Sequence, residues 1–160
     1  FNLTFAGRKC QILTTSQGRG ARLAFPSGLN GGAGTVMDEL PPYVISGDRG
    51  GRVIERVYTA LDVADSGRLV RIEGLCASAC TVYLALTRVN RVCLGPGAVL
   101  AFHQTTDIKT GKTNPKANKI VLSLYPISVQ NWIKARGGLT AKLLVMDFAE
   151  ARKHVRVCPS

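Results

Sequence analysis

From residue 43 onward, short apolar runs alternate with longer segments in which apolar residues recur every three or four positions. The short runs are bounded by glycine, proline or polar residues and predict β-strands. The predicted strands are Tyr43–Ser46, Leu69–Leu75, Arg91–Leu94 and Ala98–Phe102. The longer segments predict helices over 52–65, Ala79–Leu86, Lys116–Arg136 with a break at Pro126, and Thr140 to about Lys153.

The helix over 52–65 has the clearest periodicity. Its apolar positions share one face and are expected to contact the core; they are Val53, Val57, Leu61 and Ala64. Gly67 ends this helix as a capping glycine. The polar segment 104–115 contains glycine and proline and predicts an exposed loop.

The order of strand, helix, strand, helix, strand and then helices is typical of βαβ units. We therefore predict an α/β fold with a mostly parallel sheet and helices covering it. A length of 160 residues with 46% apolar residues fits a single domain over 1–160. Residues 1–40 give the weakest pattern, with strand-like fragments at Cys10–Thr14 and Ala21–Phe25. No uncharged window reaches the ~18 residues of a bilayer-spanning helix, so no membrane span is predicted.

The chain is strongly basic. It has 21 lysine and arginine residues against 10 aspartate and glutamate residues, a formal net charge of +11. Such a balance favours anionic surfaces in general. The basic residues are spread along the chain, and the one patterned series has no interleaved aromatic side chains; it comprises Lys109, Lys112, Lys116 and Lys119. Specific nucleic-acid binding is therefore not expected.

The segment Gly74–Cys80 lies where a predicted strand meets a predicted helix. Its small residues allow Ser78 to occupy a sharp turn with an exposed hydroxyl, and the helix start offers free backbone N–H groups. Acyl transfer needs such a turn because the tetrahedral oxyanion must meet two preorganised donors. The N–H of Ala79 is one predicted donor, and Gly50 or Gly51 supplies the second. The plain alternative is that Ser78 only caps the helix.

A serine nucleophile also needs a base within hydrogen-bond reach. The chain has two histidines, and His154 lies in a basic C-terminal segment. His103 directly follows an apolar strand and is the predicted base. The alternative is a histidine with a packing role alone.

Five cysteines are many for a chain of this length and favour an oxidising compartment. Three of them surround the serine turn, and we expect a disulfide from Cys93 to either Cys76 or Cys80. Cys10 or Cys158 can take part in a second bond. One cysteine of the five then stays free or pairs between chains.

The same cysteines permit a protein of a different class. Cys76 and Cys80 have zinc-like spacing, and Cys93 with His103 completes a Cys3His set. Tetrahedral coordination would make this a structural metal protein in which the serine is not a nucleophile. Because the later gaps in the set are unremarkable, we prefer disulfides and predict neither a metal nor another cofactor.

Together these segments resemble the proteolytic-subunit family of Clp protease, within the wider Clp/crotonase group. The matching pieces are Ile45–Gly51, Cys76–Cys80 and Arg91–Gln104. In that family they correspond to a Gly-Gly oxyanion loop, a nucleophilic serine that opens a helix, and a His-Gln pair after a strand. The similarity is closer to exported bacterial Clp-like proteins that carry the same Cys-Ala-Ser-Ala-Cys segment. It covers 43–104 well, 116–158 loosely and 1–40 poorly.

The resemblance implies a Clp/crotonase-like fold of repeated ββα and βαβ units, with a Ser-His-Asp triad. Ser78 and His103 match the nucleophile and the base. The turn Gly137–Thr140 resembles the family's turn before its acid-bearing helix, which implies Asp147 as the acid. Asp107 is a weaker choice for that role.

Three features depart from the family pattern. Asp48 and Arg49 stand where the family has Ser-Pro ahead of the two glycines. No proline follows Gln104, and cysteines bracket Ser78 on both sides. The first departure bears on which glycine N–H serves as an oxyanion donor.

The sequence thus predicts a serine hydrolase, in the first place a peptidase, that acts on a peptide or acyl substrate. The alternative is a catalytically silent member of the fold, serving as a binding or assembly module on an anionic cell-envelope surface. Because family members form rings, a homo-oligomer fits the resemblance. The chain begins at Phe1 without a leader, which fits a processed protein exported to the bacterial periplasm.

Overall fold

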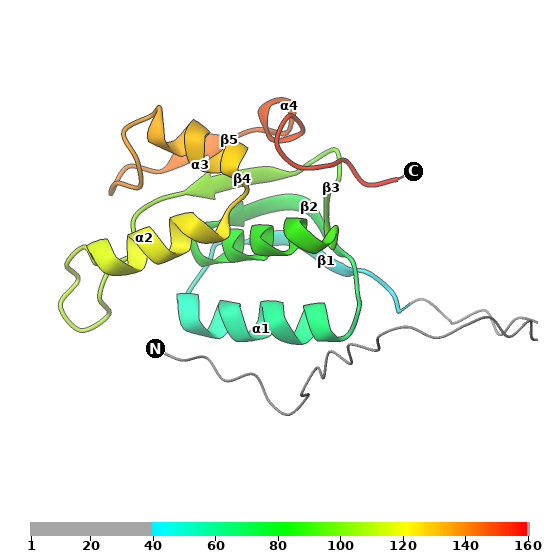
Figure 1. Ribbon diagram of the computed structural model, residues 1–160, viewed down its shortest axis with the longest axis horizontal. Helices are drawn as coiled ribbons and strands as arrows, with labels where there is room; N and C mark the ends of the chain where they lie inside the picture. The colour runs from blue at the N-terminus through cyan, green and yellow to red at the C-terminus, as the bar shows by residue number, and fades with distance from the viewer. Residues whose placement is uncertain (1–39, 160) are drawn as a thin grey trace, which may run out of the picture. The chain divides into compact units, whose positions relative to one another are not determined.

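A five-stranded sheet forms the centre of the protein (Figure 1). The computed structural model describes residues 40–159, which belong to one compact unit, Val36–Ser160. The strands are β1 (Tyr43–Asp48), β2 (Val70–Ala77), β3 (Val92–Leu94), β4 (Val99–Phe102) and β5 (Leu144–Met146). All strand pairs are parallel except β4 with β5, which is antiparallel. The predicted α/β class with a mostly parallel sheet is confirmed.

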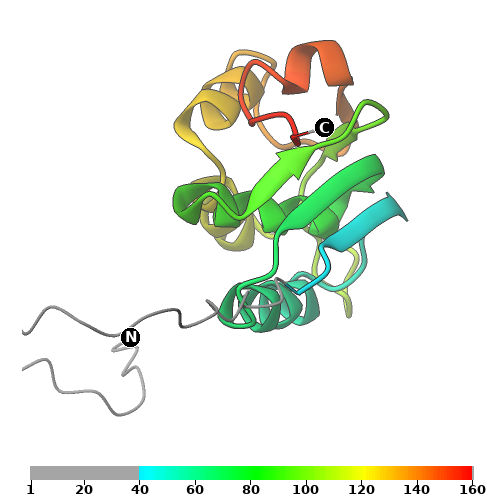
Figure 2. The same ribbon diagram turned by 90° about the vertical axis from the view of Figure 1, so that its right-hand side faces the viewer.

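The helices flank this sheet. They are α1 (Val53–Asp65), the 3₁₀-helix η1 (Ser78–Val89), α2 (Pro115–Leu124), α3 (Ile127–Lys134) and α4 (Phe148–Ala151). Helix α1 packs against η1, and α4 contacts β4. Figure 2 shows α1 near the β1 edge and the red α4 beyond β4. No helix in residues 40–159 is long and apolar enough to span a bilayer.

Strands β3 and β4 share one edge of β2 and thereby bring the C-terminal ends of β2 and β4 together. β3 pairs with the first half of β2, from Val70 to Ile72, and β4 pairs with the second half. In the second half Ala77 lies opposite Ala101. The residue that follows β2 and the residues that follow β4 therefore meet at one end of the sheet.

The core lies between the sheet and the helices. Its largest fully buried side chains include Tyr83, Phe102, Ile72 and Leu84. Burying one side chain of this size contributes about 1.5–3 kcal/mol to the free energy of unfolding. Phe102 packs edge-on against Tyr125, with ring centroids 5.3 Å apart, which connects β4 to the end of α2.

One core prediction was wrong at Leu61, which is 48% exposed. The buried face of α1 instead contains Ala60 and Val63, with Val57 partly buried. Leu61 follows Ala60 by one residue and is therefore rotated about 100° away from this face.

The predicted helix from Thr140 to about Lys153 was also wrong in its first half. The Gln104 N–H donates a 2.8 Å hydrogen bond to the Thr140 carbonyl, so the chain returns beside the end of β4. Residues Leu144–Met146 then pair with β4 as β5. Only the short α4 remains of the predicted helix.

The C-terminal segment is fastened to the sheet by a disulfide between Cys93 and Cys158, whose Cα atoms lie 4.8 Å apart. The Cys158 N–H also donates to the Leu94 carbonyl at 2.9 Å. The predicted bond from Cys93 to Cys76 or Cys80 is wrong, because this return of the chain places Cys158 beside β3. Cys10 lies outside the described residues.

Candidate active site

Ser78 stands at the junction of β2 and η1. Its backbone φ is +57°, and within residues 40–159 Asn90 is the one other non-glycine residue with a positive φ. Such a conformation costs on the order of 1–3 kcal/mol and persists only where neighbouring structure enforces it. The turn directs the Ser78 side chain toward the end of β4 rather than into η1.

His103 is the first residue after β4 and meets that side chain. Its Nε2 lies 2.7 Å from Ser78 Oγ, a hydrogen-bond distance. When Nε2 is unprotonated, the serine hydroxyl donates to it, which is the arrangement a general base requires. The Ala77–Ala101 pairing in the sheet accounts for this approach between residues far apart in the chain.

A cleft of about 690 Å³ opens beside these two side chains. One wall is the start of α1 at Ile54, and the other comes from Ile108, Val121 and Tyr125. No carboxylate lines the cleft among the described residues, and Arg52 is its one charged lining residue. The cleft therefore suits an uncharged, largely apolar group next to the serine.

Gly50 contacts the serine turn directly. A β-carbon at Gly50 would lie 2.6 Å from Ser78 Cβ and 2.8 Å from the Ala77 carbonyl oxygen, and its φ is +102°. Any side chain at this position would collide with the turn, so glycine is required. Gly50 thus packs against the backbone and Cβ of the serine turn, and Gly51 lines the cleft beside it.

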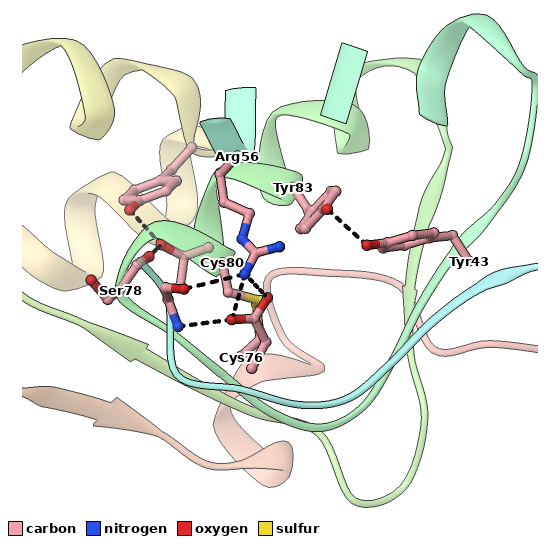
Figure 3. The surroundings of a disulfide bond; sticks show 10 residues. Tyr43, Arg56, Cys76, Ser78, Cys80 and Tyr83 are labelled. Carbon is pink, nitrogen blue, oxygen red and sulfur yellow. Dashed lines mark hydrogen bonds and ion pairs between the residues drawn. A yellow bond between two sulfur atoms is a disulfide. The ribbon is translucent and has the colours of Figure 1, made fainter. Parts of the chain in front are cut away.

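The loop is held by Asp48 at the end of β1 and Arg56 on α1. The Gly50 N–H donates a 2.8 Å hydrogen bond to Asp48 Oδ1, and Arg56 forms a 2.8 Å ion pair with Asp48 Oδ2. Arg56 also donates to the Gly50 carbonyl at 3.2 Å. Figure 3 shows the Arg56 guanidinium reaching this loop beside the serine turn.

These contacts separate the two glycines chemically. The Gly50 N–H is occupied by Asp48, whereas Gly51 lines the cleft and its N–H donates to no atom of the described residues. The N–H of Ala79, in the first turn of η1, lacks an intrahelical acceptor. The free donors at the cleft are therefore Gly51 and Ala79.

A disulfide between Cys76 and Cys80 closes the serine turn, with Cα atoms 5.3 Å apart (Figure 3). Both cysteines are fully buried. Together with Cys93–Cys158, this bond leaves none of the three cysteines of the zinc alternative as a thiolate, so that set is not available to a metal. Two disulfides fit an oxidising compartment.

Among the described residues, Asp147 forms no hydrogen bond with His103. Its side chain caps α4 by accepting a 2.9 Å hydrogen bond from the Glu150 N–H. Because β4 and β5 are antiparallel and Phe102 pairs with Leu144, the chain runs away from His103 toward Asp147. Asp147 lies four residues along the chain from position 143, the position opposite His103, which is roughly 13 Å of strand. The geometry gives no support to Asp147 as the orienting acid.

The Asp107 carboxylate forms hydrogen bonds within its own turn and none with His103. It accepts 2.9 Å hydrogen bonds from the N–H groups of Lys109 and Thr110. The hydrogen bonds from Thr110, followed by that from Lys109, lower the pKa of Asp107. No carboxylate within residues 40–159 forms a hydrogen bond or ion pair with His103.

Sequence reasoning missed Asp48 and Arg56 as parts of the site. The signal for Asp48 was local, because an aspartate two residues before a glycine commonly accepts the backbone N–H in an Asx turn. Arg56 gave no such signal, since its contact depends on how α1 packs beside β1.

No protein-family model matches the chain, and no curated protein matches it. Several solved structures match, and one of them, described as "Crystal structure of an Enzyme", shares 9% identity and gives a TM-score of 0.49. The match covers 77% of this chain and 81% of that one. A likeness this distant bears on neither family nor activity.

Proposed function

We propose that this chain is a serine hydrolase on a Clp/crotonase-like fold, with Ser78 as nucleophile and His103 as general base. The observation that supports it most is the 2.7 Å contact between Ser78 Oγ and His103 Nε2, at a cleft and beside a helix start. A serine that only capped η1 would accept a hydrogen bond from a backbone N–H of the first turn, whereas among residues 40–159 Ser78 Oγ bonds to His103 and to no backbone N–H.

In the proposed reaction, Ser78 Oγ attacks the acyl carbon while His103 Nε2 takes the hydroxyl proton. The bond from the acyl carbon to the leaving group then breaks, and His103 returns the proton to that group. Water attacks the resulting ester on Ser78, again losing its proton to His103; the bond between the acyl carbon and Ser78 Oγ then breaks, and His103 returns the proton to Oγ. The products are a free acid and a regenerated serine.

The negative charge that develops on the carbonyl oxygen needs two preorganised donors. Gly51 and Ala79 supply N–H groups that are free at the cleft, and the dipole of η1 favours an anion at its start. Of the expected pair Gly50 and Gly51, we assign the donor to Gly51, because the Gly50 N–H already bonds to Asp48.

The proposal is a Ser-His pair rather than a complete triad. An acid fixes the histidine tautomer and stabilises the imidazolium, and its loss can lower kcat by about 10⁴-fold. We therefore expect slow turnover of activated esters. A peptide bond is the next substrate class to examine, and export to the bacterial periplasm fits the two disulfides.

Two observations favour a second candidate. Within residues 40–159 no carboxylate contacts His103, and the chain has a net charge of +11; together these suit a catalytically silent module that binds an anionic surface or a second copy of itself. Such a module would retain the Ser78 turn without turnover.

Kinetics of p-nitrophenyl ester hydrolysis separate the two. We expect the wild-type protein to turn over, and Ser78→Ala, His103→Ala and the double variant to lose about the same activity because the two residues act as a unit. Ser123→Ala, which alters an exposed serine on α2, is the matched control. Equal turnover in Ser78→Ala and wild type would refute the hydrolase and leave the binding module.

A further inference from the structure

Among residues 40–159, Thr81 is the one buried residue of a polar type, and none of its surface is exposed. Its Oγ1 lies 2.6 Å from the Ser78 carbonyl oxygen and 2.6 Å from the Tyr125 hydroxyl. A buried hydroxyl is retained where its hydrogen bonds matter, since leaving it unpaired costs about 1–3 kcal/mol. Both of its partners belong to the cleft region.

The direction of each hydrogen bond follows from the proton count. The Ser78 carbonyl can only accept, so the single proton of Thr81 Oγ1 is donated to it. Thr81 Oγ1 then has lone pairs alone to offer, and the Tyr125 hydroxyl must be the donor between them. The Tyr125 hydroxyl therefore donates a hydrogen bond to Thr81 Oγ1, which in turn donates to the Ser78 carbonyl.

Tyr125 lies where it can hold these two hydrogen bonds in place. It directly follows α2, is 2% exposed and lines the cleft. Its ring packs on Phe102, the residue immediately before His103. Tyr125 thus contacts both the strand end that carries the base and, through Thr81, the turn that carries the nucleophile.

We propose that Tyr125 is a positioning residue for the nucleophile, acting through Thr81 on the Ser78 carbonyl. This inference rests on the proposed hydrolase function. By holding the Ser78 carbonyl, the two hydroxyls stabilise the left-handed backbone at φ +57° that points Oγ toward His103. Without them the peptide unit after Ser78 can rotate, which moves both the hydroxyl and the Ala79 N–H.

The test compares wild type, Tyr125→Phe, Thr81→Val and Thr81→Ser in two assays, p-nitrophenyl ester kinetics and labelling by a fluorophosphonate. Tyr125→Phe removes one oxygen and keeps the ring on Phe102. We expect it to lower kcat and the Ser78 labelling rate by about tenfold, the effect of one hydrogen bond at the upper end of its usual range, with KM unchanged. Thr81→Ser keeps the hydroxyl and should retain both rates.

Two further proteins sharpen the result. The Thr81→Val/Tyr125→Phe double variant should be no slower than Thr81→Val alone, because the residues act in series. Tyr58→Phe, on the exposed face of α1, should match wild type. A Tyr125→Phe protein with wild-type kcat and labelling rate would overturn the inference while leaving the hydrolase intact. A wild-type protein that takes no label at Ser78 would overturn the proposed function and this inference with it.

Discussion

The Gly50 N–H donates a 2.8 Å hydrogen bond to the Asp48 carboxylate, two residues earlier in the chain. The same carboxylate forms an ion pair with Arg56, so the turn is fixed from both β1 and α1. One consequence is that Gly51, not Gly50, has its N–H free at the cleft. The Gly51 oxyanion donor of the proposed hydrolase therefore depends on the Asp48 carboxylate.

Removing that carboxylate tests the assignment. Asp48→Ala should lower kcat for ester hydrolysis by up to about 10²–10³-fold, the usual loss for one oxyanion donor, with a small change in KM. Its physical reason is that Gly51 loses the turn that aims its N–H. Asp62→Ala, an exposed aspartate on α1, serves as control. A kcat equal to that of the control would show that the oxyanion donors do not depend on Asp48.

Gly50→Ala should destabilise the folded protein. The new methyl group would lie 2.6 Å from Ser78 Cβ at a φ of +102°. We expect a loss of more than 1–3 kcal/mol in the free energy of urea unfolding, because steric overlap adds to backbone strain, roughly 1–3 kcal/mol by itself. Gly137→Ala is the matched control, since φ is +92° there but the methyl group meets no atom within 4 Å. Equal losses in the two variants would contradict the contact with Ser78.

The parts of the fold that local patterns predicted are β1 to β4, α1, the start of η1 and the break at Pro126 between α2 and α3. Their apolar runs are bounded by glycines and prolines, and these signals need no knowledge of distant residues. The apposition of Ser78 and His103 is not local, and it came from the family resemblance and the scarcity of histidines. In the structure it follows from the parallel pairing of β2 with β4.

The errors share a long-range cause. β5 exists because the chain at Thr140 bonds to Gln104, and nothing in the sequence of 140–147 marks that contact. The pairing of Cys93 with Cys158 likewise depends on the C-terminal segment returning to β3. The role of Asp147 as the acid is implied by the resemblance alone, and in the structure its carboxylate caps α4.

The two disulfides should contribute differently to stability and activity. Cys93–Cys158 spans 65 residues and Cys76–Cys80 spans 4. The loss of chain entropy on closing loops of these sizes predicts about 4 kcal/mol for the longer and about 2 kcal/mol for the shorter. Replacing each pair by two alanines and measuring urea unfolding checks that order.

The rate of fluorophosphonate labelling at Ser78 should depend more on the shorter disulfide than on the longer one. The Cys76→Ala/Cys80→Ala protein should react more slowly at Ser78 than the Cys93→Ala/Cys158→Ala protein, because only the shorter bond encloses the serine turn. Faster labelling of the Cys76→Ala/Cys80→Ala protein would show that the turn does not depend on its disulfide. Peptide mapping without reductant confirms which bonds form in the wild type.

Burial of Tyr125 predicts a loss of stability at alkaline pH. Desolvation raises the pKa of Tyr125 to about 12, even though its hydrogen bond with Thr81 lowers that pKa. In the unfolded chain the pKa is about 10. Since the folded-state value is the higher one, the stabilisation is fully present below about pH 10 and is lost as the pH rises toward 12, about 3 kcal/mol in all.

Urea unfolding at about pH 9 and about pH 11 measures this effect, since the loss falls between the two pKa values. Tyr125→Phe should lose less stability between the two conditions than wild type. The Tyr58→Phe protein, changed at an exposed tyrosine, should behave as wild type. An identical loss in wild type and Tyr125→Phe would show that Tyr125 does not remain protonated in the folded protein.

If His103 activates Ser78 as a nucleophile, a fluorophosphonate probe should modify Ser78 at a rate that depends on His103. The full chain is treated with the probe, digested without reductant and mapped by mass spectrometry, beside His103→Ala and Ser123→Ala. We predict a single adduct on Ser78 in wild type and Ser123→Ala, and a rate at least about 10²-fold lower in His103→Ala, since a positioned base contributes about 10²–10⁴-fold. No adduct on Ser78, or an adduct formed equally fast without His103, would show that His103 does not activate Ser78 as a nucleophile.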